Sequence, residues 1–190
     1  MVKIKDIRKS FGGNKVLKGI SLQGNAGQCI GIVGTNGSGK STLLSIIAGI
    51  RKADSGTIEI CGKDISKKPR HATEYIGYIP QENPVFPDLS VKDNLMLWYS
   101  DSKVTYEQAV SGGVIEMLGV SIAMAVANDP PVIILDEPSA ALDLPTKLLI
   151  RDYLKSYVTR GGTVILATHD EEELSICNVL YVLVDGVLHN

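Results

Sequence analysis

The sequence predicts an α/β fold whose core is a sheet of parallel strands, and three observations support this prediction. Segments such as 132–135 are continuously apolar, which is typical of strands that are buried on both faces of a sheet. Such segments alternate along the chain with helical patterns such as 143–160, and this alternation favours parallel strands connected by helices. The chain has 190 residues, of which 44% are hydrophobic and 21% charged, so its size and composition fit one globular domain rather than a disordered protein.

The N-terminal part of the chain is expected to form mostly short strands. Residues 2–7 lie in a mixed run of polar and apolar side chains, and segment 16–23 continues this run with glycine interruptions. An apolar strand then ends at a glycine-rich loop, and the helix after this loop is expected to stop near Gly49. The elements predicted in this part are strands at 2–7, 16–23 and 29–33, a helix at 40–50, and strands at 56–60 and 75–79.

The C-terminal part is expected to contain longer helices and a final hairpin. Asp143 suits the N-cap of a helix, Pro145 suits its first turn, and the pair Gly161-Gly162 would end it. The helical pattern of 90–128 suggests a lobe inserted into the sheet. The elements predicted in this part are helical segments at 90–128, strands at 132–135 and 163–168, helices at 143–160 and 171–177, and a hairpin of 179–184 with 187–189. The apolar face of the 143–160 helix is expected to comprise Ile150, Tyr153, Leu154, Tyr157 and Val158.

Charge and cysteine content exclude several classes of protein. The formal net charge is −2, without a long block of one sign, which gives no support for nucleic-acid binding through a basic surface. The three cysteines are scattered and form no C-x-x-C motif, which argues against a disulfide framework or a zinc site. No apolar run approaches the length of about 18 residues that a spanning helix needs, and no signal peptide is recognisable, so a membrane role would require a separate chain.

A phosphate-binding loop is predicted at residues 34–41, which fit the pattern G-x-x-x-x-G-K-[ST]. Glycines allow backbone N–H groups to curl around an oxyanion, and the helix that follows offers its N-terminus to the same anion. Lys40 would contact the β- and γ-phosphates, and the Ser41 hydroxyl suits Mg²⁺. The apolar strand before the loop and the apolar helix after it are the context that a nucleotide-binding loop requires.

A second apolar strand, 132–135, ends in the two acidic residues Asp136 and Glu137. A carboxylate at the tip of a strand beside the phosphate-binding loop can hold Mg²⁺, directly or through water. A neighbouring glutamate can orient and deprotonate a water molecule for attack on the γ-phosphate. The order of the two motifs therefore predicts a nucleoside triphosphatase.

Further motifs resemble those of the ATP-binding subunits of ABC transporters, and the resemblance extends along nearly the whole chain. The matching segments are 34–42 (Walker A), 132–137 (Walker B), Ser139–Asp143 (D-loop), Gln81 (Q-loop), His169 (switch histidine) and Phe11 (adenine-stacking aromatic). The implied fold is that of a P-loop NTPase, with a parallel core sheet, an N-terminal antiparallel β subdomain and a shortened helical lobe at about 84–128. The whole chain, 1–190, would be a single ATP-binding domain of this type.

The resemblance also implies roles for individual residues, with ATP and Mg²⁺ as the bound groups. Lys40, Glu137 and His169 would act in catalysis, with Glu137 as the base for water and His169 in contact with the γ-phosphate. Ser41, Gln81 and, through water, Asp136 would hold Mg²⁺. The nucleotide-binding residues would be Phe11, Val16, Gly34, Thr35, Asn36, Gly37, Ser38, Gly39, Lys40, Ser41, Thr42 and Gln81.

The signature motif of the family, LSGGQ or similar, is the one departure from its pattern. One interpretation is a degenerate signature at Ser111–Gly113, which lacks the usual polar and basic residues after it. The other is that Ser111–Gly113 is coincidental and that the signature segment is missing between Val120 and Ser121. The short interval between Gln81 and Asp136 and the good match just before Walker B favour the missing segment.

The implied function is ATP hydrolysis that powers transport by separate, multi-spanning permease subunits. Two such ATP-binding subunits, identical or different, would pair head to tail, with Asp143 at the contact between them. The chain would then lie peripherally on the cytoplasmic face of the membrane. The alternatives are a soluble, non-transport ATPase of the same superfamily and an ATP-binding regulator with impaired hydrolysis. The transported substrate and the direction of transport do not follow from the sequence.

Overall fold

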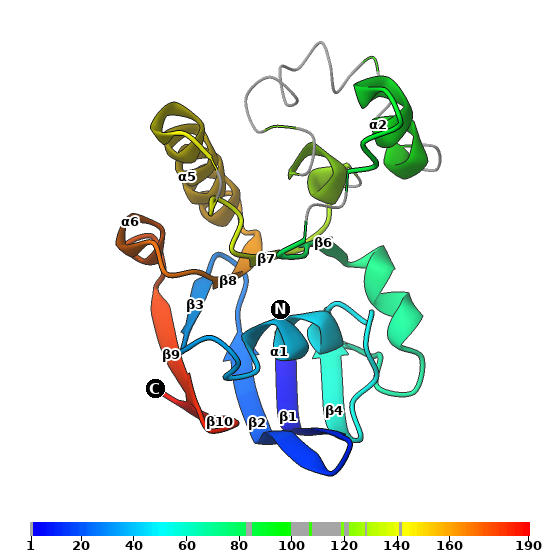
Figure 1. Cartoon of the computed structure of the whole chain (residues 1–190), viewed down its shortest axis with the longest axis vertical. Helices are drawn as coiled ribbons and strands as arrows, with labels where there is room; N and C mark the ends of the chain where they lie inside the picture. Colours follow the sequence, from blue (N-terminus) through cyan, green and yellow to red (C-terminus); the bar gives the residue numbers. More distant parts are fainter. Residues whose placement is uncertain are drawn as a thin grey trace.

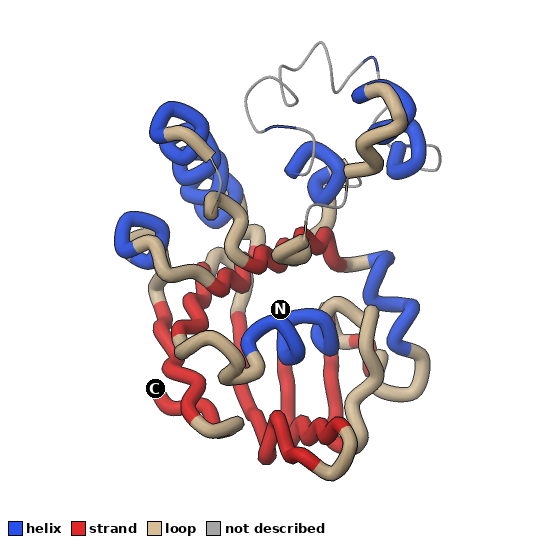
Figure 2. Tube along the Cα trace, viewed as in Figure 1, coloured by secondary structure: helices blue, strands red, loops and turns tan. Residues whose placement is uncertain are grey.

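The computed structural model describes residues 2–82, 85–99, 107, 119, 122–127, 129–140 and 142–190, without the side chains of 98 and 99. Two sheets make up its framework, one of four and one of six strands. Figure 1 shows the N-terminal strands at one end of the molecule and helix α2 at the other end. Figure 2 shows the same arrangement coloured by helix, strand and loop. Among the described residues, no helix has the length and apolar character needed to span a bilayer.

The smaller sheet is antiparallel in its pairing and has the strand order β2-β1-β4-β5. The two short strands predicted at 2–7 and 16–23 are parts of one long hairpin that turns at Gly12 and Gly13, both with positive φ. The pattern underestimated their length because the outer ends of both strands are polar and exposed. The strands are β1 (Val2–Phe11), β2 (Asn14–Gly24), β4 (Ser55–Ile60) and β5 (Lys63–Asp64).

The larger sheet confirms the predicted parallel core, with the strand order β10-β9-β3-β8-β7-β6. Every neighbouring pair is parallel except the C-terminal hairpin of β9 and β10. The carboxyl ends of the parallel strands therefore meet at one edge of the sheet. The strands are β3 (Cys29–Val33), β6 (Ile76–Ile79), β7 (Val132–Asp136), β8 (Thr163–Ala167), β9 (Val179–Val184) and β10 (Val187–His189).

Both faces of the parallel sheet are covered, which explains why its strands are continuously apolar. Helix α1 (Lys40–Ile47) belongs to a core cluster with the antiparallel sheet, and Ile134 points into that cluster. Its neighbours Ile133 and Leu135 point to the other face, against α5 (Leu144–Thr159). The predicted face of α5 is confirmed: Ile150, Leu154 and Tyr157 are buried, while Tyr153 and Val158 pack partly buried against the same cluster.

Two helices are shorter than predicted, and one short helix was not predicted. Helix α1 ends at Ile47 instead of residue 50, because Gly49 with φ 74° turns the chain. Helix α6 (Glu171–Leu174) ends three residues before the predicted end, because Asn178 is already bonded to strand β3. The 3-10 helix η1 (Pro69–Glu74) lies in a segment without a periodic pattern. Of the helical stretch predicted at 90–128, the structure describes as helical α2 (Val91–Tyr99), residues 122–126 and the single positions 107 and 119.

Candidate functional site

The glycine-rich loop lies at the carboxyl edge of the parallel sheet, between the end of β3 and the start of α1. A Cβ atom on Gly34 would lie 2.5 Å from the carbonyl oxygen of Leu183, so no other residue fits there without a shift. Gly39, the N-cap of α1, has φ 106°, a backbone conformation that residues with a side chain rarely adopt. The glycines of the motif are therefore required by the local backbone.

Lys40 opens helix α1 and is buried within the loop that precedes it. Its Nζ donates to the carbonyl oxygen of Gly34 at 2.7 Å and to that of Thr35 at 3.3 Å. Because Gly39 has no side chain to cap the helix, the first N–H groups of α1 have no capping acceptor from that residue. A cation and the positive end of a helix dipole thus lie together, as anion binding requires.

Asp136, the last residue of β7, has the properties of a cation ligand. The residue is 1% exposed, and neither carboxylate oxygen has a hydrogen-bond partner within the described part of the chain. Burial raises the pKa of its carboxyl group, while the nearby Ser41 hydroxyl and the Lys40 charge oppose this rise. Gln81, just beyond the end of β6, lines the same pocket. Hard oxygen ligands of this kind suit Mg²⁺, so the residues present fit the predicted metal.

Glu137, His169 and Lys40 form a contiguous polar cluster. The Nε2 atom of His169 lies 3.3 Å from Oε1 of Glu137 and 3.5 Å from Nζ of Lys40. Glu137 adopts φ 51°, which is uncommon outside glycine, and its N–H donates to the carbonyl oxygen of Ala167 at 2.8 Å. Backbone strain of this kind is concentrated at functional sites.

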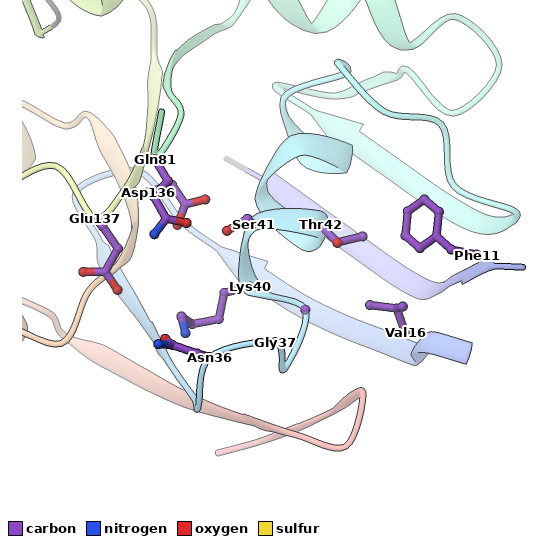
Figure 3. Close-up of a pocket in the computed structure, with 11 residues that line it drawn as sticks. Phe11, Val16, Asn36, Gly37, Lys40, Ser41, Thr42, Gln81, Asp136 and Glu137 are labelled. Carbon is purple, nitrogen blue, oxygen red and sulfur yellow. The ribbon is translucent and has the colours of Figure 1, made fainter. Parts of the chain in front are cut away.

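Lys40, Asp136 and Glu137 line one pocket with a volume of about 390 Å³. Figure 3 shows Phe11 and Val16 at one end of the pocket, on the antiparallel strands, and Gln81, Asp136 and Glu137 at the other end. An elongated ligand with an apolar ring and an anionic tail fits this polarity. The residues lining the pocket are Phe11, Val16, Asn36, Gly37, Gly39, Lys40, Ser41, Thr42, Gln81, Asp136 and Glu137.

The remaining predicted site residues support this pocket from outside its lining. Gly34 and Thr35 accept hydrogen bonds from Lys40, and His169 reaches the pocket through Glu137 and Lys40. The Ser38 hydroxyl is buried and has no hydrogen-bond partner among the described residues. Every predicted site residue therefore lines this pocket or lies directly beside it.

Phe11 is 40% exposed and has cationic neighbours. The Lys9 ammonium lies 5.4 Å from the centre of its ring, and the Arg51 guanidinium lies 5.1 Å from it. Arg51 was not among the predicted site residues, because its proximity depends on the approach of the α1 end to the β1 hairpin. A cation beside an aromatic ring is attracted by the π face, so both groups help to fix the ring.

Two ion pairs between α5 and the segment after His169 were also not predicted. Lys147 Nζ lies 3.0 Å from Oδ2 of Asp170, and Arg151 Nη1 lies 2.9 Å from Oε2 of Glu172. Asp170 also caps α6, and the Lys147 ammonium is the main cause of its lowered pKa. These pairs hold the residue that follows His169 in place. Charges spaced four residues apart on a helix are the only local signal of such an arrangement.

Two further predictions concern segments around the pocket. Asp143 is confirmed as the N-cap of α5, with its carboxylate accepting from the N–H of Thr146 at 3.1 Å, and it is exposed. The two positions proposed for the signature motif, Ser111–Gly113 and the junction of Val120 with Ser121, lie outside the described residues.

Comparison with known families and sequences gives consistent matches. The family model described as ABC transporter matches residues 17–140. The Nod factor export ATP-binding protein I of Burkholderia lata is 32% identical over 212 residues, which cover 97% of this chain and 68% of that protein. The protein of the same name from Paraburkholderia xenovorans is 33% identical over 207 residues and covers 95% and 66%, respectively. Because 212 exceeds the 190 residues of this chain, the first relative has residues within the matched region that have no counterpart here.

Solved structures give the same result. A bacterial ABC transporter cassette solved as a dimer superposes with a TM-score of 0.91 at 27% identity, covering 100% of this chain and 97% of that one. The same cassette in a dimeric post-hydrolysis state, bound to ADP and Pi, superposes with a TM-score of 0.88 and the same identity and coverage.

Proposed function

This chain belongs to the ABC transporter family of ATP-binding proteins, and we propose that its 390 Å³ pocket binds and hydrolyses Mg-ATP to power transport by separate membrane subunits. The observation that supports this most directly is the cluster at the carboxyl edge of the sheet. There, a buried cation, a strained glutamate and a buried carboxylate without a hydrogen-bond partner in the described part of the chain lie around one pocket. The aromatic ring of Phe11 stands at the opposite end, where an adenine base would stack on it.

The proposed roles follow from charge and position. The phosphates lie against the loop amides and the α1 N-terminus, and Lys40 leaves its carbonyl partners to neutralise the β- and γ-oxygens. Glu137 orients a water molecule in line with the γ-phosphorus and accepts its proton. His169, in contact with both Glu137 and Lys40, positions the carboxylate and donates to a γ-phosphate oxygen.

Mg²⁺ would be held by Ser41 and Gln81 and, through water, by Asp136. Its chemistry when bound is to neutralise charge on the β- and γ-oxygens during phosphoryl transfer. The chain's own contribution is the buried Asp136 carboxylate, which has no hydrogen-bond partner among the described residues and is therefore available to a cation.

The proposed partners are a second ATP-binding subunit and a multi-spanning permease, with this chain on the cytoplasmic face of the membrane. The two solved structures described above are dimers, and the named relatives are export ATP-binding proteins. Head-to-tail pairing would place Asp143 of one subunit near the other. The net charge of −2 gives no support for the alternative function, an ATPase that acts on ribosomes or DNA.

The test is Mg-dependent ATP hydrolysis by the purified chain, alone and together with a multi-spanning membrane subunit that co-purifies with it. Glu137→Gln is expected to retain ATP binding and to lower turnover by at least about 100-fold, because the proton acceptor is lost. Lys40→Ala is expected to lose binding as well. Glu59→Gln, at an exposed position on β4, is the matched control and should behave like wild type.

Two outcomes would contradict parts of the proposal. Unchanged turnover in Glu137→Gln would exclude Glu137 as the base. Tight ATP binding without turnover, in the presence of the permease, would instead support the regulator with impaired hydrolysis.

A further inference from the structure

Two cysteines that are far apart in the sequence face each other beside the strand that leads into the phosphate-binding loop. Cys29 is the first residue of β3, and Cys177 lies three residues after the end of α6. Their Sγ atoms are 3.3 Å apart, across a sequence separation of 148 residues. Cys29 is buried, Cys177 is half-buried, and the third cysteine, Cys61, is exposed.

The backbone holds this pair in place through two further bonds. The N–H of Asn178 donates to the carbonyl oxygen of Cys29 at 2.8 Å, and the N–H of Cys29 donates to Oδ1 of Asn178 at 2.8 Å. Strand β3 pairs in parallel with β9 from the next residues onward, Ile30 opposite Val179. By this register Asn178 lies opposite Cys29, so Cys177 is one residue before that position and precedes β9. The two bonds to Asn178 and the 3.3 Å between the sulfurs show that the two side chains are held against each other.

The space around Cys177 is also suited to this arrangement. A Cβ atom on Gly31 would lie 3.1 Å from Sγ of Cys177, so the absent side chain leaves room for the sulfur above β3. Cys29 and Gly31 are two residues apart on one strand and therefore face the same side of the sheet. Disulfide formation would close the sulfur separation from 3.3 Å to a bond of about 2.0 Å.

The electrostatics of the pair differ between its two sulfurs. The hydrogen bond to Cys177, burial and the charge of Glu173 all raise the pKa of Cys29, so this cysteine stays protonated. Glu173 is 1% exposed, and its carboxylate oxygens have no hydrogen-bond partner in the described portion of the chain. Cys177, the more accessible sulfur, is therefore the one that an oxidant meets first.

We propose that Cys29 and Cys177 are a dithiol modification site, which a hydroperoxide converts into an intramolecular disulfide. The sulfur of Cys177 attacks the outer oxygen of the peroxide, the O–O bond breaks, and Cys177 becomes a sulfenic acid while the peroxide leaves as water or an alcohol. The sulfur of Cys29 then attacks that of Cys177, the S–O bond breaks, and the hydroxyl departs with the Cys29 proton as water. The two electrons lost by the sulfurs reduce the peroxide, and an added dithiol reverses the reaction.

The position of the Cys29–Cys177 disulfide predicts its effect on ATP turnover. One end is anchored at the start of the strand before the loop with Lys40, and the other end lies in the segment that begins at His169. A covalent link restrains that segment against β3. This consequence for turnover rests on the proposed ATPase function, whereas formation of the disulfide does not.

The test uses the full chain, reduced, freed of reductant, treated with hydrogen peroxide and then alkylated before peptide mapping. The reactive thiols are expected to fall from three to one, with a single peptide pair joining Cys29 to Cys177 and no higher-mass species. Cys61→Ser is the matched control and should form the same bond. Cys29→Ser should stop at a sulfenic acid on Cys177, which dimedone traps.

Retention of three alkylatable thiols in the wild-type chain, or a bond that involves Cys61, would overturn the proposal, and neither result depends on a variant folding. Turnover of the oxidised chain is expected to fall several-fold and to recover with dithiothreitol. A disulfide that forms without any change in turnover would remove the regulatory consequence only. No ATP hydrolysis in either state would instead argue against the proposed function.

Discussion

Replacing Asp136 by asparagine is expected to stabilise the ligand-free protein and to weaken its response to Mg-ATP. Asp136 is 1% exposed, burial raises its pKa, and its oxygens have no hydrogen-bond partner among the residues described. A buried polar group without a partner costs about 1–3 kcal/mol, and more if it is charged. Asparagine has nearly the same shape without the charge, so the additional cost of burying a charge is removed while the amide stays buried.

The magnitude can be expressed as a melting temperature. For a chain of 190 residues, 1 kcal/mol corresponds to about 2–4 °C, so Asp136→Asn should raise the Tm without ligand by roughly 2–10 °C. In wild type, Mg-ATP at about 100 times its Kd should add ~2.7 kcal/mol of stability, and the variant should gain clearly less. Asp152→Asn, on the exposed face of α5, is the control and should change stability by less than ~0.5 kcal/mol.

The difference in stability between Asp136→Asn and wild type should also depend on pH in a defined direction. Because the folded pKa of Asp136 is raised above its ordinary value of 3.8, the folded state binds more protons than the unfolded state between the two values. Stability therefore falls as the pH rises through this window, and the full penalty is present above it. The gain from Asp136→Asn should be complete above the raised pKa of Asp136 and should shrink as the pH falls toward 3.8.

The assay is differential scanning fluorimetry and urea unfolding, with and without Mg-ATP, across this pH range. A variant that is less stable than wild type without ligand would refute the reasoning, because Asp136 would then make stabilising bonds in the folded protein. An equal response to Mg-ATP in both proteins would refute its role as a cation ligand.

Three further substitutions test other parts of the structure. Gly39→Ala should cost about 1–3 kcal/mol and weaken ATP binding, because φ is 106° and the added Cβ lies 3.1 Å from Val16; normal binding by calorimetry would contradict the strain. Leu154→Ala should cost about 2–5 kcal/mol in urea unfolding, since its side chain is fully buried; a loss below ~1 kcal/mol would mean that the site collapses freely. Lys147→Met should cost at most about 1 kcal/mol at neutral pH, because Lys147 and Asp170 are partly exposed. That cost should be complete above the ordinary aspartate pKa of 3.8 and should vanish as the pH falls through the lowered pKa of Asp170 in the folded protein; a pH-independent loss would point to packing instead.

The part of the site that could be predicted was the part formed by contiguous residues. The phosphate-binding loop, Asp136 and Glu137 each follow an apolar strand, and the ends of parallel strands meet at one edge of a sheet. Phe11, Gln81 and His169 needed the resemblance to a family, because nothing local to them indicates a ligand. Arg51 and the α5–α6 ion pairs were missed, since each depends on which elements lie side by side.

The sequence by itself determined the class of fold, most strands and helices, and the position of the phosphate-binding loop, because hydrophobic periodicity and turn residues restrict the backbone locally. Only the tertiary structure decided which distant residues meet. The strand order β9-β3-β8-β7 brings His169 to Lys40 across 129 residues and Cys177 to Cys29 across 148. Strand order is set by how both faces of the sheet are buried at once, and no local pattern encodes that choice.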